Sequence, residues 1–399
     1  MSKKHTSNDA IIDGLNISRR GFLDLAKGTG LISLSTLATT WTPRALAATN
    51  KINLVSWGGS YQAAQKLAVE EPYTKATGVA FQNIEKAGSG PALLTAQEQT
   101  QNIAWDVVDM LKDQAALLSG QGLLAELDYD KVLEPAPDGT PASEDYIPGS
   151  LGGDGKRGAL ATSISTSTVL AYNKKAFGNG HVPTSVKDVF DLKRFPGRRA
   201  LEKGPTDNLE WALYADGVPR DKVYEVLSTP AGVDRAFRKL DTIKSHCVWW
   251  SEGAQTPQML AQGDAVIGSD YNGRIFTSIV EDKQPLEFIW DGAVYFWDGW
   301  VIPAGLPKER LEAALRFVRY ATSTKALANQ ARYIAYAPAR KSALKMAQNY
   351  TYYKNSSVQM MPYMPTSVDH LKIGIQKNVH FWANYGPALT QRFSAWLAS

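Results

Sequence analysis

The chain alternates between two spacings of its apolar residues. Residues 51–57, KINLVSW, alternate apolar and polar side chains and are followed by two glycines, which predicts a strand that ends in a loop. The apolar residues between 63 and 68 then recur at helical spacing. Ser60 is placed to cap this helix at its start, and Gly78 is placed to end it.

Strand and helix patterns continue to alternate after this first unit. Further strands are predicted at residues 78–85 and 104–110, with a helix rich in alanine and glutamine between them. Parallel strands need long crossover connections, which are usually helices. The pattern therefore predicts an α/β architecture built on parallel sheet.

A change of composition divides the chain. Proline and glycine become frequent between Leu127 and Gly158, which marks a surface stretch where the chain leaves one lobe. A second α/β series begins with a strand at residues 166–173 and includes another at 263–272. A strongly helical run follows over residues 307–333. We therefore expect two α/β lobes.

The dipeptide Asn272-Gly273 lies between two apolar runs and predicts a turn. This turn would place Tyr271 and Arg274 side by side at the end of a buried strand. Two roles are open to Arg274 at this point: a solvated turn residue or a clamp for a ligand.

Size and composition indicate a soluble globular protein. With 399 residues, 44% hydrophobic and 21% charged, the chain is long enough for about two domains. The supply of 11 Trp and 17 Tyr fits either an aromatic ligand cleft or a large core. Residues 1–47 hold six basic and three acidic side chains, so the rest of the chain is nearly neutral. That balance gives no support for binding nucleic acid or an anionic membrane.

The first 47 residues have the features of a secretory signal peptide. A basic segment precedes a short apolar run at 31–37, and Ala45-Leu46-Ala47 is a small-x-small cleavage site. Ser18–Leu23, SRRGFL, is similar to the twin-arginine export motif, although Asp24 stands where lysine is common, so the general secretory route stays open. We expect cleavage near Ala47 and a periplasmic protein. Because Cys247 is the only cysteine, neither a lipid anchor near the cleavage site nor an intramolecular disulfide is expected.

The residues that most enzymes need are not brought together by any motif. The five histidines lack metal-ligand spacing, and no GxSxG or Walker A sequence occurs. Residues 153–158 contain GxGxxG, but no strand pattern precedes them, which favours a loop over a dinucleotide site. We expect no enzyme activity, no cofactor and no bound metal.

Six separated segments resemble one family of receptors. INLVSWGGSY, EEPYTKATGV, AWDVVDM, GDAVIGSDYNGRI, FWDGWVIPAGLPK and IAYAPARKSA occur in an order and spacing similar to the spermidine/putrescine-type solute-binding proteins of ABC importers. The resemblance covers essentially the whole mature chain. It implies a type II periplasmic-binding fold, in which two α/β lobes are joined by a hinge and close on a ligand in the cleft between them. The lobes expected are residues 48–158 with about 298–345, and 159–297 with about 346–399.

The resemblance also implies a set of ligand-binding residues. In that family an aromatic box stacks on the ligand, and carboxylates bind its ammonium groups. An aromatic residue precedes the ammonium-binding acid Asp298 by one or two positions, so either Trp297 or Phe296 fits that role. Asp207 fits another ligand acid or an ordinary acid at a helix start, and Trp250 fits either a cleft wall or the core. The candidate residues are Trp57, Tyr61, Asp207, Trp250, Tyr271, Arg274, Trp297, Asp298, Tyr336 and Trp382.

Arg274 departs from the putrescine-binding pattern, in which an acid can stand at this position. A guanidinium here repels a second ammonium, whereas it binds a carboxylate or phosphonate well, as do the amides of Gly58–Ser60 at a helix start. With Asp298 kept for an amine, we favour the clamp role and a zwitterion of the γ-aminobutyrate kind over a polyamine.

Two alternatives remain open, together with expected partners. A ferric-ion receptor of the same fold needs a tyrosine pair, for which Tyr352-Tyr353 is available but without a matching histidine. An exported hydrolase is the alternative from a different class. For a solute-binding protein we expect a small-molecule ligand, an inner-membrane ABC permease as partner and a monomeric state.

Overall fold

The computed structural model describes residues 51–86, 90–178, 180–251 and 255–399. The predicted signal peptide, its twin-arginine motif and its cleavage site near Ala47 lie outside the described residues. Residues Ala48–Ser399 belong to one compact unit. In the part of the chain that the structure describes, no helix has the length and apolar character needed to span a membrane.

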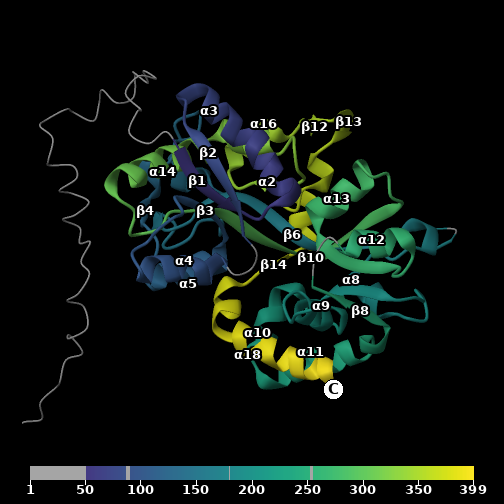
Figure 1. Ribbon diagram of the computed structural model, residues 1–399. Coiled ribbons are helices and arrows are strands. Elements are labelled where there is room, and N and C mark those ends of the chain that lie inside the picture. The colour runs from purple at the N-terminus through teal and green to yellow at the C-terminus, as the bar shows by residue number, and fades with distance from the viewer. Residues whose placement is uncertain (1–50, 87–89, 179, 252–254) are drawn as a thin grey trace, which may run out of the picture. The chain divides into compact units, whose positions relative to one another are not determined.

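One ten-stranded sheet organises this unit (Figure 1). Eight strands follow one another in the order β2 (Ala80–Glu85), β1 (Lys51–Ser56), β3 (Val107–Leu111), β10 (Leu286–Val301), β6 (Ala161–Asn173), β9 (Ile267–Tyr271), β7 (Arg199–Glu202) and β8 (Cys247–Trp250). The short strands β11 (Ala337–Pro338) and β14 (Ile375–Gln376) pair with β6 and β10. Two small sheets pair β4 (Leu127–Asp128) with β5 (Arg157–Gly158) and β12 (Thr351–Tyr352) with β13 (Asn355–Gln359).

The sheet has parallel pairing at both ends and antiparallel pairing in its middle. Strand β1 is parallel to β2 and β3, and β7 is parallel to β8 and β9. The long strands β6 and β10 pair antiparallel with each other and join the two parallel groups. The α/β prediction is therefore confirmed.

Helices flank both parallel groups (Figure 1). Those around β1–β3 include α2 (Gly59–Gln65), α3 (Glu71–Thr77), α4 (Gly90–Gln99), α5 (Lys112–Gly120) and α14 (Lys308–Ala321). Those after β6 include α8 (Val186–Phe190), α9 (Asn208–Ala215), α10 (Val223–Leu227), α11 (Pro230–Asp241), α12 (Gln255–Gln262) and α13 (Asn272–Val280). The others are α6 (Tyr129–Val132), α7 (Ala142–Asp145), α15 (Thr324–Gln330), α16 (Lys341–Ala347), α17 (Val368–Ile373) and α18 (Val379–Ala398).

Two local predictions about helix ends have different outcomes. Gly78 does end α3, in the left-handed conformation with φ 78° that glycine adopts readily. Ser60 does not cap α2, because Gly58 stands at the N-cap and its N–H donates to Gln62 Oε1 at 3.1 Å. The predicted turn at Asn272-Gly273 is also wrong, since these residues form the first turn of α13.

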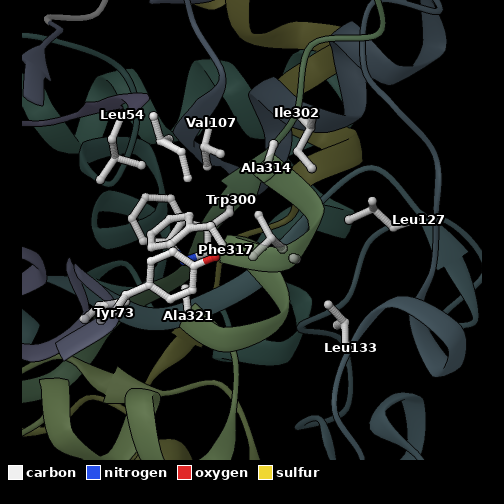
Figure 2. Close-up of a cluster of buried hydrophobic side chains, with 14 of the residues drawn as sticks. Leu54, Tyr73, Val107, Leu127, Leu133, Trp300, Ile302, Ala314, Phe317 and Ala321 are labelled. Atoms are coloured by element: carbon white, nitrogen blue, oxygen red, sulfur yellow. The ribbon is translucent and has the colours of Figure 1, made fainter. Parts of the chain in front are cut away.

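A large aromatic and aliphatic core holds β10 against the helices on one side of the sheet. Trp300 and Phe317 are buried with ring centroids 5.7 Å apart, and Tyr73 packs on Phe317 at 5.4 Å (Figure 2). Leu54 and Val107, from β1 and β3, belong to the same cluster. This packing fixes the part of β10 that carries Asp298.

Strand alternation in β10 decides which of its side chains near Asp298 face the core and which face away from it. The register with β6 shifts between Asp298 and Gly299 because β6 carries one extra residue there, Ser163, which forms a β-bulge in β6. Phe296 and Asp298, two residues apart, both line the cavity, whereas Trp297 between them points away from it and lies in the core cluster. A Cβ on Gly299 would lie 2.5 Å from the Ala161 carbonyl oxygen, so only glycine fits here.

A buried ion pair ties α7 to the start of α16. Arg340 Nε and Asp145 Oδ2 are 2.6 Å apart, with side chains 0% and 5% exposed. Since removing one partner leaves a buried charge without compensation, we expect Arg340→Leu to lower the free energy of unfolding by about 3 kcal/mol.

Denaturant unfolding measures this loss. The control is Arg235→Leu, which breaks a pair with Asp216 whose side chains are 40% and 38% exposed, and which should cost less than about 1 kcal/mol. Equal losses in the two variants would contradict a special role for the buried pair.

Candidate ligand-binding site

A cavity of about 1250 Å³ lies where several strands of the sheet end. Its walls come from the residues that follow β1 and β2, from the ends of β7, β8 and β9, from α13 and from β10. The lining residues that matter below are Trp57, Tyr61, Lys86, Thr166, Glu202, Trp250, Tyr271, Arg274, Phe296, Asp298 and Tyr336. Ligands of α/β proteins commonly bind outside the carboxyl ends of the strands.

Most of the predicted site residues come together in this cavity. Seven of them line it: Trp57, Tyr61, Trp250, Tyr271, Arg274, Asp298 and Tyr336. Trp249 packs on Phe393 and Trp396 instead, as expected for a strand neighbour of Trp250. Contact of these seven with a ligand stays a prediction.

Three predicted residues lie outside the cavity lining. Trp297 is in the core for the reason given above, and Phe296 takes the wall position. Trp382 is buried in α18, where its Nε1–H donates to Glu210 Oε1 at 2.7 Å. Asp207 is buried at the start of α9 with φ 67°, where the charge of Lys377 opposes the rise in its pKa that burial causes.

A pair of buried carboxyl groups forms one pole of the cavity. Asp109 in β3 accepts hydrogen bonds from Tyr61 Oη at 2.7 Å, from Trp57 Nε1 at 3.2 Å and from Gln65 Nε2. Asp298 lies against it, so burial first and the neighbouring Asp109 second raise the pKa of Asp298 well above its usual range. We call Asp109 and Asp298 the acid pair.

Sequence reasoning missed Asp109 and Lys86. Asp109 lies in AWDVVDM near the carboxyl end of a predicted parallel strand, and that placement was the available signal. Lys86 follows β2 and is 5% exposed, and its Nζ lies 2.8 Å from the centroid of the Trp57 ring. No sequence pattern distinguishes such a lysine from a surface one.

Arg274 forms the opposite pole. It lies in the first turn of α13, half-buried, with its Cζ 5.6 Å from the centroid of the Tyr271 ring. Among the described residues, no ion pair or side-chain hydrogen bond engages its guanidinium. Its charge nevertheless acts on Glu202. Burial raises the pKa of Glu202 to about 7, and the positive charges of Lys377 and Arg274 limit this rise.

Tyr336 lies between the two poles. Its ring centroid is 5.3 Å from that of Tyr61, and a Cβ on Gly273 would lie 2.6 Å from its Cε1. Burial raises the pKa of Tyr336 to about 12, with Arg274 opposing this rise and Asp298 adding to it. The phenol ring therefore lies between the Arg274 guanidinium and the acid pair.

The ferric-ion alternative gains no support from this geometry. Tyr352 donates its hydroxyl hydrogen to Glu281, and Tyr353 is 39% exposed. Neither residue lines the cavity. In the described ranges, no group of three or more His, Cys, Asp and Glu side chains could hold a metal ion.

Comparisons with known proteins bear on the class of this site. The family described as bacterial extracellular solute-binding protein matches residues 68–358. A γ-aminobutyric acid-binding protein of Pseudomonas aeruginosa is 33% identical over 365 residues, which are 92% of this chain and 96% of that protein.

Solved structures support the same assignment. A periplasmic binding protein of Agrobacterium tumefaciens in complex with glucopine has a TM-score of 0.73 at 28% identity, covering 87% of this chain and 99% of that one. A γ-aminobutyrate receptor has a TM-score of 0.69 at 30% identity, covering 88% and 98%. The predicted type II fold and the prediction of a non-enzymatic protein are confirmed. A spermidine/putrescine-binding protein of Streptococcus pneumoniae is 15% identical and shows the fold alone.

The raised pKa of Glu202 makes stability depend on pH. An unfolded glutamate loses its proton near pH 4.5, whereas folded Glu202 keeps it until about pH 7, so its contribution to stability falls as pH rises through this window. We expect the stability of Glu202→Gln relative to the wild type to increase between pH 4.5 and 8.

Urea unfolding across this pH range measures the difference. Glu309→Gln, which changes an exposed glutamate of α14, is the control and should show a constant difference. A constant difference for Glu202→Gln as well would show that burial does not hold its proton.

Proposed function

Because this chain belongs to the bacterial extracellular solute-binding proteins, the substrate-binding components of ABC transporters, we propose that it captures a small zwitterion of the γ-aminobutyrate kind. The observation that carries this proposal is the Arg274 guanidinium, which has no ion-pair partner among the described residues and faces the same cavity as the acid pair. Two relatives whose names refer to γ-aminobutyrate support the choice of ligand.

The ligand carboxylate binds Arg274 in this proposal. A guanidinium offers paired N–H donors in a geometry that matches a carboxylate, and these charge-assisted hydrogen bonds are stronger than neutral ones. Since no described protein carboxylate forms an ion pair with Arg274, binding does not require an existing pair to be broken.

The ligand ammonium binds between the acid pair and the face of Trp57. An alkylammonium over an indole ring gains about 0.5–2 kcal/mol, and a carboxylate beside it fixes its direction. The methylene groups of the ligand then lie against Tyr61, Tyr271 and Tyr336. A diamine is disfavoured because Arg274 repels its second ammonium.

Delivery and location complete the proposal. Residues 1–47 act as a signal peptide cleaved near Ala47, with twin-arginine export favoured, and the mature monomer delivers its ligand from the periplasm to an inner-membrane ABC permease.

The cavity of about 1250 Å³ exceeds the volume of a four-carbon amino acid. Closure of the two lobes about β6 and β10, as in hinged binding proteins, would reduce it around the ligand. The lobe boundaries remain those predicted from the sequence.

Arg274→Gln tests the carboxylate pole. We expect the affinity for γ-aminobutyrate to fall at least about 100-fold, roughly 2.8 kcal/mol, because glutamine keeps a donor but loses the charge and the paired geometry. Calorimetry on the mature protein measures the change. Arg198→Gln is the control, because Arg198 is exposed and does not line the cavity.

The same titrations with putrescine and spermidine test ligand class. Tight diamine binding by the wild type that Arg274→Gln leaves unchanged would refute the zwitterion proposal.

A further inference from the structure

Lys86 is placed beside Trp57 by the pairing of two parallel strands. The register of β1 with β2 pairs Ser56 with Glu85, so the next residue of each strand, Trp57 and Lys86, are neighbours at the carboxyl ends. The backbone N–H of Lys86 donates to the Ser56 carbonyl at 2.8 Å, which extends the ladder by one bond. The position of Lys86 is therefore fixed by the sheet.

The side chain of Lys86 is buried and points into the cavity. It is 5% exposed and lines the cavity, and within the described ranges its Nζ has no hydrogen-bond partner. A Cβ on Gly90, the first residue of α4, would lie 2.6 Å from Lys86 Cδ, so the stem packs tightly there. What stabilises the ammonium is the Trp57 ring at 2.8 Å and the nearby acid pair.

The charges that face this ammonium come from two strands. Asp298 in β10 and Asp109 in β3 both favour its charged form, whereas burial has the larger, opposite effect and lowers the pKa of Lys86 to about 8. From α2 the only titratable neighbour is Tyr61, which donates to Asp109. Glu85 is exposed and packs on Gly58, and α4 approaches with the uncharged Gly90.

These surroundings are those that the ammonium of a ligand requires. A cation over the face of Trp57 and beside the acid pair is the arrangement assigned to the ligand under the proposed function, and Lys86 already provides it from within the chain. Two ammonium groups cannot share this space, because like charges in a buried site repel strongly.

We propose that Lys86 and the ligand compete for one ammonium subsite, formed by Trp57, Asp109 and Asp298, so that binding exchanges one ammonium for another. This inference rests on the proposed function. It makes Lys86 a specificity-determining residue: a ligand without an ammonium cannot replace the charge that the acid pair loses when Lys86 leaves. A role for Lys86 in binding the ligand carboxylate is disfavoured, because the acid pair beside it would repel that carboxylate.

The competition predicts an unusual pH dependence. Protonated Lys86 competes, whereas its neutral form does not, so the wild-type affinity for γ-aminobutyrate should rise up to about tenfold between pH 7 and 9. The ligand amine, with an ordinary alkylamine pKa near 10.4, stays charged over most of this range. Lys86→Met should bind about tenfold more tightly than the wild type at pH 7 and lose the rise.

Two further variants complete the experiment, which is calorimetry on the mature protein with γ-aminobutyrate from pH 6.5 to 9. Lys86→Arg keeps its charge throughout and should remain weak at every pH, and it keeps the test decisive if Lys86→Met fails to fold. Lys112→Met is the matched control, because burial also lowers the pKa of Lys112 but its side chain does not line the cavity. It should retain the wild-type profile.

The outcomes separate this inference from the proposed function. The competition is overturned if Lys86→Met binds more weakly than the wild type, or if either Lys86 variant shows the wild-type pH profile. In that case the result for Arg274→Gln can still support the zwitterion proposal. Absence of γ-aminobutyrate binding at every pH overturns the proposed function and this inference with it.

Discussion

Burial of a carboxylate costs free energy unless hydrogen bonds or opposite charges compensate for the lost water. The groups that do this for Asp109 organise the candidate binding site. Its hydrogen-bond donors Trp57, Tyr61 and Gln65 all come from the segment that follows β1. Satisfying this one acid therefore also sets the aromatic wall on that side of the cavity. The charge of Lys86 is drawn to the same place by Asp109 and Asp298.

The two poles depend on different parts of the sheet. Asp109 and Asp298 lie in the neighbouring antiparallel strands β3 and β10, and Arg274 lies in the helix that follows β9. Since β6 pairs with both β10 and β9, it connects the strands behind the two poles. Under the proposed function, rotation of the lobes about these long strands would change the distance between the poles and close the cavity on the ligand.

Much of the fold followed from patterns that local physics enforces. The alternation of strands and helices predicted the α/β architecture, and Gly78 ended its helix because glycine tolerates positive φ. The Asn272-Gly273 prediction failed because the segment continues as a helix against Tyr336 instead of returning as a strand. Turn propensity alone does not contain that packing.

The site was harder to predict because it depends on neighbours distant in sequence. The choice of Phe296 over Trp297 is the exception, because it follows from strand alternation with Asp298 once residues 286–301 are known to form one strand. Trp382 was assigned to the site by resemblance, but its indole N–H satisfies the buried Glu210 in another part of the unit. The charged states of Asp109 and Lys86 depend on each other and on Asp298, and the three residues come from three different strands or strand ends. The order of residues in the sequence does not show that they lie together.

The crystal structure of the mature protein with γ-aminobutyrate bound tests the two-pole account most directly. The account predicts the ligand carboxylate within hydrogen-bond distance of the Arg274 guanidinium and the ligand ammonium beside Asp298 and the face of Trp57. A ligand in the opposite orientation, with its carboxylate on Lys86 and its ammonium on Glu202, would contradict it.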